Sequence, residues 1–411
     1  MKVCITIFCV SLILLVLAVP VFAQQAQWSK IYTDSQGEGN CVIATSDGCF
    51  VIAGSSKGHF LLAKADSNGE LLWTRTYQTG EANCVVQTSD GGYALAGSGE
   101  VNFIKTDASG NLQWSKNYVN TVLNMTFRVN SVIQAFDDGY VLAGYVPEGN
   151  APQFDWTLRT SKNGEAIWNK TFGTVVAQSF AYDVVTVDDG FVLAANRKLY
   201  CLDDDGDVLW SEPSVWAGSL VKTSDGGYLV VSVDGAALTK TDAQGKTQWS
   251  NTFKLGSQYS FFKDAIQTSD GGYIACGQAY PSYEGVAWIV KVDSTGKQQY
   301  IKSAETFSGH NGFANSIIEV SKNVYVFSGA IKSISDASYS EVWLAKVSSS
   351  ILSAGNSEFP INNTPNSSAT TPSTPTPSIP ELSQYAFLPI AVATTIFAAT
   401  IIRHRSKSQL K

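Results

Sequence analysis

The sequence is poor in methionine, histidine and charged residues, and each shortage limits what the protein can do. Its 411 residues include two Met, three His and only 15% charged residues. One of the three histidines, His404, lies close to the C-terminus, so we expect no metal site built from several histidine ligands. Apolar residues are plentiful, at 44%, which is enough for a folded core.

Cysteine is also scarce, and its count is odd outside the first 23 residues. Seven cysteines become five once Cys4 and Cys9 are set aside, and five cannot all pair within one exported chain. Cys276 lies in an apolar run and is expected to pack as a small buried side chain. The core, rather than a disulfide framework, must therefore stabilise the fold.

Both ends of the chain carry targeting features. Residues 1–23 combine Lys2, an apolar run, and the small residues Val21 and Ala23 at positions −3 and −1 of a cleavage site, which predicts a signal peptide. Residues 382–402 are almost entirely apolar and residues 403–411 are basic, which predicts one transmembrane helix with a cytoplasmic tail. The rest of the chain has an excess of acidic residues, so we expect no binding to nucleic acid.

A sequence unit recurs along residues 24–352. Its first copy contains Thr45-Ser46-Asp47-Gly48, an apolar run, Lys64-Ala65-Asp66 before Gly69, and then Trp73. Copies follow at intervals of about 45 residues, each with four short runs of β-branched and aromatic residues separated by Asp-Gly or Asn-Gly turns. The pattern predicts an all-β fold in which each unit forms a four-stranded antiparallel sheet.

The Lys-x-Asp-x-x-Gly-x-x-x-Trp part of this unit resembles the tryptophan-docking repeat of pyrroloquinoline-quinone-type propellers. The Asp-Gly-Gly-Tyr part resembles extracellular propeller repeats of archaeal and bacterial surface proteins. The resemblance implies a β-propeller whose outer-strand aromatic residues pack between neighbouring blades. These blade-docking aromatics are Trp28, Trp73, Trp114, Trp168, Trp210, Trp249 and Tyr300.

The two ends of the repeat region complement each other. The segment Trp28–Tyr32 precedes the first complete unit, while the last unit stops after its third strand at Lys346-Val347. We therefore expect seven blades, with the N-terminal strand completing the last blade and covering its open edge.

One position of the unit is expected to line the propeller axis. The residue six before each turn aspartate is small or polar, which fits either a narrow wet axis or a ring of hydrogen-bonding groups around a channel. Asp183 and Asp264 are its only charges. Cys41 and Cys84 occupy matching places in adjacent blades, where a disulfide would need a Cα separation of about 5.5–6 Å. The channel ring consists of Cys41, Cys84, Ser131, Asp183, Ser219, Asp264 and Ser316.

No motif identifies a metal or a cofactor. The vicinal cysteine pair common in quinone-dependent dehydrogenases is absent. The carboxylates of residues 203–207 occupy a repeat hairpin and lack the later Glu of a calcium loop. We therefore expect neither a metal nor a cofactor.

Residues 353–381 are rich in Pro, Ser and Thr, which predicts an extended stalk. Pro380-Glu381 before the apolar run resembles the Pro-Glu-Phe sorting signal of archaea, with Leu382 in place of Phe. The resemblance implies processing by an archaeosortase, and a plain one-helix anchor is the alternative. The candidate glycosylation sites are Asn124, Asn169, Asn362 and Asn366.

Two functions fit this organisation. The first is a non-catalytic, surface-anchored propeller that binds a glycan, an envelope protein or another cell, because motifs repeated in every blade indicate scaffolding. The second is a secreted polysaccharide hydrolase or lyase with Asp183 and Asp264 as paired carboxylates. Whether the protein is an enzyme is open at this point.

Overall fold

The computed structural model describes residues 28–32, 36–120, 125–145, 155–172, 181–195, 197–232, 235–255, 259–280, 285–303, 311–332 and 340–353. Within these ranges the fold is all-β, as predicted, apart from the short helix α1 (Ser349–Ser353). None of the helices in these ranges has the length and apolar character needed to cross a membrane. The predictions for residues 1–23 and 354–411 and for Asn124 lie outside the described residues.

Five four-stranded antiparallel sheets make up most of the chain. One contains β1 (Trp28–Tyr32), β29 (Ser340–Ser348), β28 (Val324–Lys332) and β27 (Asn311–Ser321). The other four are consecutive in sequence: β11 (Arg128–Gln134), β12 (Tyr140–Tyr145), β13 (Asp155–Thr160) and β14 (Ala166–Phe172); β15 (Ala181–Val187), β16 (Gly190–Ala195), β17 (Lys198–Leu202) and β18 (Val208–Pro213); β19 (Ala217–Lys222), β20 (Tyr228–Ser232), β21 (Ala237–Thr241) and β22 (Thr247–Thr252); β23 (Ser260–Gln267), β24 (Tyr273–Ala279), β25 (Val286–Val292) and β26 (Gln298–Ser303).

A seven-stranded sheet spans the first two complete sequence units. It contains β2 (Gly37–Ala44), β3 (Phe50–Ser56), β4 (His59–Ala65), β5 (Leu71–Gln87), β6 (Tyr93–Gly99), β7 (Phe103–Thr106) and β8 (Leu112–Lys116). The long strand β5 pairs with β4 through its first half and with β6 through its second half. It is therefore the outer strand of one unit and the innermost strand of the next. The two-residue strands β9 (Val119–Asn120) and β10 (Met125–Thr126) pair with each other.

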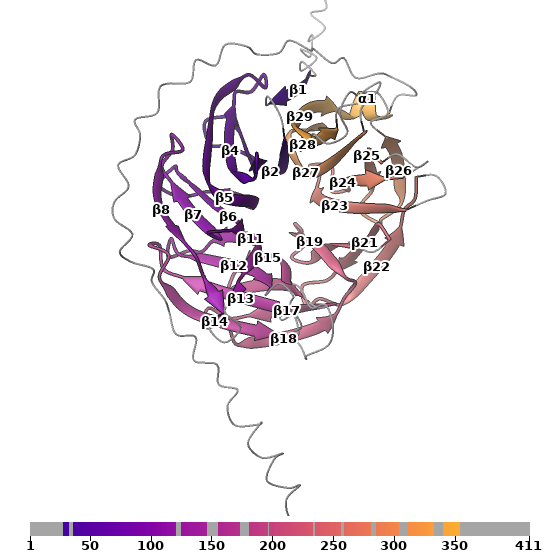
Figure 1. Ribbon diagram of the computed structural model, residues 1–411. Coiled ribbons are helices and arrows are strands. Elements are labelled where there is room, and N and C mark those ends of the chain that lie inside the picture. The colour runs from indigo at the N-terminus through magenta and orange to yellow at the C-terminus, as the bar shows by residue number, and fades with distance from the viewer. Residues whose placement is uncertain are drawn as a thin grey trace, which may run out of the picture.

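The sheets are arranged around a common axis, with β2, β11, β15, β19, β23 and β27 among the innermost strands (Figure 1). Successive strands run in opposite directions, so the turn after an innermost strand and the hairpin between the third and fourth strands lie at the same end. In the first unit these are residues 45–49 and 66–70. We call this end the turn face. The opposite end contains a groove lined by residues that include Gly58, Gly80 and Gly99, and we call it the groove face.

The core lies between neighbouring sheets. Leu229 and Leu238 of one sheet pack with Phe262 and Trp288 of the next, and all four are fully buried. Both faces of each sheet are covered in this way. The second strand of a unit therefore carries a short continuous apolar run, such as residues 50–53 of β3, rather than an alternation of apolar and polar residues.

The N-terminal strand completes the sheet formed by the C-terminal strands, as predicted. β1 pairs with β29 from Trp28 opposite Lys346 to Tyr32 opposite Val342. The Trp343 Nε1–H group donates a buried hydrogen bond of 2.9 Å to Ser29 Oγ. The pairing covers an edge of β29 that would otherwise be open to other strands.

Outer-strand tryptophans pack on a hairpin glycine of the next unit. A Cβ atom added to Gly69 would lie 2.7 Å from the ring of Trp28, and one added to Gly110 would lie 2.9 Å from the ring of Trp73. The same close approach joins Trp114, Trp168, Trp210 and Trp249 to Gly164, Gly206, Gly245 and Gly296. Tyr300 instead packs against a cluster that includes Leu352 of α1. Because Trp28 and Gly69 belong to different sheets, their contact joins the first and last sheets of the ring.

We expect Gly110→Ala to destabilise the protein more than Gly91→Ala. Both glycines have φ near +80°, so both variants lose about 1–2 kcal/mol from the left-handed backbone. The new methyl group at residue 110 also meets the ring of Trp73, whereas nothing lies within 4 Å of the site at residue 91. Such overpacking adds about 1–3 kcal/mol. Urea unfolding measures the difference, and equal losses would contradict the docking role of this glycine.

Candidate functional site

The turn aspartate of the repeat forms an ion pair with a buried lysine or arginine side chain. Asp47 accepts hydrogen bonds from Lys64 Nζ at 2.6 Å and from the Thr45 hydroxyl, which together hold the pKa of Asp47 well below its usual range. Corresponding ion pairs join Lys105 to Asp90, Arg159 to Asp137, Lys240 to Asp225 and Lys291 to Asp270. A motif that recurs in this way stabilises the turns of many units, and it does not define a unique reactive site.

Each innermost strand contains a β-bulge directly before its axial residue. In β2 the register shifts between Gly39 and Cys41, and equivalent shifts occur in the six other innermost strands. A bulge re-aims the side chains around it. The axial positions that follow these bulges are the seven that the sequence analysis assigned to the channel ring.

The two axial carboxylates are bridged by a serine. Ser219 Oγ lies 3.3 Å from Asp183 Oδ2 and 3.2 Å from Asp264 Oδ1. Leu220 N donates to Asp183 Oδ2 at 2.8 Å, and Ile317 N donates to Asp264 Oδ2 at 3.0 Å. Each carboxylate therefore accepts a backbone hydrogen bond from the next sheet around the axis.

Burial raises the pKa of both carboxyl groups. The pKa of Asp264 is raised to about 6 by desolvation, against the lowering effect of the bonds from Ile317 N and the Ser316 hydroxyl, and the nearby charge of Asp183 raises it further. Desolvation also raises the pKa of Asp183. Asp264 is therefore largely protonated below about pH 6, and it can then donate a hydrogen bond or a proton.

The other axial residues also make contacts with the next sheet or half-sheet. Cys41 Sγ lies 3.9 Å from the carbonyl oxygen of Val85, and Cys84 Sγ lies 3.8 Å from that of Val132. Ser131 hydrogen-bonds Asp183. Ser316 Oγ accepts a bond of 3.3 Å from Val42 N, which joins β27 to β2. The polar groups at the axis thus link the sheets to one another.

A second set of links comes from asparagines that the sequence analysis did not single out. Asn40, at the bulge of β2, donates to the Ala82 carbonyl at 3.0 Å. Asn83, Asn130 and Asn315 make equivalent bonds to Val129, Ala181 and Gly39. The signal was present in the sequence, because an asparagine directly precedes the axial residue in four of the units.

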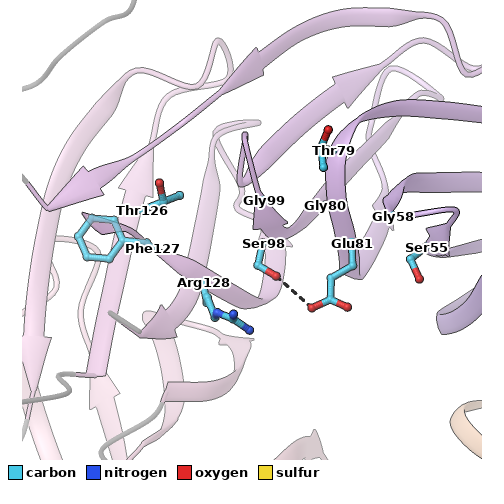
Figure 2. Close-up of a pocket in the computed structure, with 10 residues that line it drawn as sticks. All are labelled: Ser55, Gly58, Thr79, Gly80, Glu81, Ser98, Gly99, Thr126, Phe127 and Arg128. Carbon is cyan, nitrogen blue, oxygen red and sulfur yellow. Dashed lines mark hydrogen bonds between the residues drawn. The ribbon is translucent and has the colours of Figure 1, made fainter. Parts of the chain in front are cut away.

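An open groove of about 650 Å³ lies on the groove face, where the two halves of the seven-stranded sheet meet β10 and β11 (Figure 2). Figure 2 shows the side chains of Glu81 and Arg128 on either side of Ser98. The Ser98 hydroxyl donates to Glu81 Oε1 at 3.1 Å. Neither Glu81 nor Arg128 forms an ion pair with another described residue. The lining is Ser55, Gly58, Thr79, Gly80, Glu81, Ser98, Gly99, Thr126, Phe127 and Arg128.

Two of the glycines that line this groove are required by the close approach of their strands. Gly80 and Gly99 are a cross-strand pair with φ of 142° and 153°. A Cβ atom on Gly80 would lie 2.3 Å from the Ser98 carbonyl oxygen, and one on Gly99 would lie 2.2 Å from that of Thr79. Sequence reasoning missed the groove, because its residues come from three separate units and share no motif.

Comparison with known proteins identifies the architecture. Residues 157–354 match the protein family described as outer membrane protein assembly factor BamB. The chain is similar to virginiamycin B lyase from Staphylococcus aureus, in a catalytically inactive form with quinupristin, at 10% identity and a TM-score of 0.56, over 78% of this chain and 99% of that one. The fold is a β-propeller.

The other comparisons agree with this assignment. The selenomethionine-substituted form of the same lyase aligns with a TM-score of 0.53, at 10% identity and over the same shares of both chains. No curated protein sequence matches this chain. At such low identity the likeness concerns the propeller fold alone, while the family match supports the predicted quinone-type repeats over nearly half of the chain.

The other predicted site residues have these places in the structure. Asn169 is half-buried in β14, opposite Leu158. Residues 203–207, which contain four aspartates and Gly206, form the hairpin between β17 and β18, where Asp207 pairs with Lys170. No group of three His, Cys, Asp or Glu side chains among the described residues could hold a metal ion.

Proposed function

We propose that this protein is a seven-bladed propeller displayed at the cell surface, where it binds an extracellular ligand without catalysing a reaction. The blades are the five four-stranded sheets and the two halves of the seven-stranded sheet, which share β5. The observation that carries the proposal is the bonding of both axial carboxylates by backbone N–H groups of the next sheet. Such bonds give Asp183 and Asp264 a structural role in joining blades.

In this proposal the ends of the chain place the propeller outside the cell. Residues 1–23 direct export and residues 353–381 form a stalk. Residues 382–402 either remain as a transmembrane helix or are removed by an archaeosortase after recognition of Pro380 and Glu381. Both routes leave the propeller at the cell surface.

We assign ligand binding to the groove beside Glu81 and Arg128. An acidic and a basic side chain, neither of which has an ion-pair partner among the described residues, border a groove that is also lined by Gly58, Gly80 and Gly99, so the groove suits a ligand that carries polar and charged groups. A glycan with acidic substituents fits this description, as does a charged segment of an envelope protein.

Binding to a glycan array tests the assignment. We expect Arg128→Gln to weaken binding about tenfold or more, because a hydrogen bond to a charged group contributes about 1.5–3 kcal/mol. Lys222→Gln, which removes an exposed lysine of β19 paired with Asp188, should bind as the wild type does. Equal binding by the wild type and Arg128→Gln would place the ligand elsewhere.

One observation favours the second candidate, a polysaccharide hydrolase or lyase. The two contacts of Ser219 keep the facing oxygens of Asp183 and Asp264 no more than roughly 6.5 Å apart, which is below the upper limit of about 9.5 Å for paired carboxylates in glycosidases. Polysaccharide cleavage that is abolished by Asp264→Asn and retained by Arg128→Gln would establish this candidate in place of the binding protein.

A further inference from the structure

The two axial thiols are neighbours on the innermost strands of adjacent half-sheets. Cys41 lies on β2 and Cys84 on the second half of β5, each directly after a bulge. Cys41 Sγ is 3.9 Å from the carbonyl oxygen of Val85, the residue next to Cys84. Both side chains are partly exposed at the axis, whereas Cys201 and Cys276 are buried.

The interaction between the two thiols makes them chemically unequal. It lowers the pKa of Cys84 and raises the pKa of Cys41. The other hydrogen bonds of the two thiols, to backbone carbonyl oxygens at 3.8 and 3.9 Å, are long and weak. Oxidation to a disulfide would therefore sacrifice little hydrogen-bond energy. Both cysteines are free in this structure.

We propose that Cys41 and Cys84 are a redox-sensitive pair that closes to a disulfide when the protein meets a peroxide. The Cys84 thiolate attacks one peroxide oxygen, the O–O bond breaks, and Cys84 becomes a sulfenic acid as the first water leaves. The sulfur of Cys41 then attacks the Cys84 sulfur and displaces hydroxide, which takes the Cys41 proton and leaves as the second water. Two thiols lose two electrons and two protons, and one peroxide becomes two waters.

The bond would join two blades at the axis. A disulfide requires a Cα separation of about 4.4–6.8 Å, and the contact of Cys41 Sγ with the carbonyl oxygen of Val85 brings the Cys41 side chain beside the strand segment that carries Cys84. The bulges beside both cysteines are points where the ladder is already interrupted, so the backbone can adjust there with little loss of pairing. Export from the cytoplasm would place the pair where disulfides persist.

Peptide mapping of the full-length protein tests the pair. The protein is treated with hydrogen peroxide or with a thiol reductant, alkylated and digested without reduction. We expect a cross-linked peptide containing Cys41 and Cys84 only after peroxide, together with the loss of two alkylatable thiols. The melting temperature should rise by roughly a few degrees on oxidation, because the bond constrains the unfolded chain.

Two variants provide the controls. Cys84→Ser places at this axial position the residue that three other units already carry, so the variant should fold, keep Cys41 alkylatable and show no rise in melting temperature. Cys49→Ser changes a turn cysteine and should leave the cross-link intact. The proposal is wrong if both thiols stay alkylatable after peroxide, if they oxidise separately, or if the cross-link contains another cysteine.

Discussion

Deletion of residues 24–33 is expected to lower the melting temperature of the protein by roughly 10 °C or more. The deletion removes β1 and with it the ladder to β29. It also removes the buried ring of Trp28 and the buried hydrogen bond of 2.7 Å from the Tyr32 hydroxyl to the Gly69 carbonyl. Losing a buried tryptophan alone costs about 3–5 kcal/mol. Differential scanning calorimetry of the truncated and intact proteins measures the effect.

Two point variants separate the causes. Trp28→Ala should reproduce much of the loss, because it empties the space beside Gly69. Lys30→Ala removes only the 2.7 Å ion pair with the exposed Glu70 and should cost less than about 1 kcal/mol. An unchanged melting temperature after the deletion would refute closure of the ring by β1.

The free energy of unfolding is expected to fall as the pH rises from about 4 to about 6. The pKa of Asp264 is about 6 in the folded protein against 3.8 for an ordinary aspartate, so the folded state binds more protons in this range. The loss amounts to about 3 kcal/mol at most, at about 1.4 kcal/mol per unit. Asp183 acts in the same direction, because its pKa is also raised.

The turn aspartates act in the opposite direction at lower pH. Burial by itself would raise the pKa of Asp90 and of Asp225. The hydrogen bonds from Lys105 and Lys240, together with those from a threonine hydroxyl and a backbone N–H group at each turn, outweigh it and lower the pKa of both aspartates to about 2. Their stabilisation is present above the ordinary pKa and is lost as the pH falls through about 4 to 2. Stability should therefore be greatest near pH 4.

Thermal melts from pH 3 to pH 7 test this profile. Asp264→Asn cannot ionise and should flatten the decline between pH 4 and 6. Asp205→Asn, at an exposed hairpin position, should keep the decline. A decline of equal steepness in Asp264→Asn and the wild type would show that this carboxyl is not its source.

The strands could be predicted from the sequence because each unit carries its own turn chemistry. Asp47-Gly48 and Asn68-Gly69 mark the ends of runs that form β2, β3 and β4, and Gly48 and Gly69 adopt positive φ there. Closure followed from counting, since the segment Trp28–Tyr32 had no unit of its own.

The links between sheets could not be predicted in the same way. The bulge at Asn40 shifts the pairing of β2 with β3 by one residue. The order of apolar and polar residues in β2 does not mark the position of this shift, so the bulge could not be predicted from the sequence. The ion pair between Lys64 and Asp47 joins the third strand of a unit to the turn that follows its first strand. These two residues stand in separate parts of the sequence motif, so the motif does not reveal that they pair. The groove depends on how β5 continues through Gly80 from one half-sheet to the next, which is a property of the assembled ring.

The pairing of β1 with β29 also bears on how the chain is made. Ser29 bonds Trp343 across a separation of 314 residues, so β1 leaves the ribosome long before its partner strand has been made. Pairing over such a separation forms slowly. Until then both β1 and the sheet of β27 to β29 keep an unsatisfied edge. A chain that ends before β29 could not form this pairing, and ring closure thus distinguishes chains that contain β29 from shorter fragments during biosynthesis.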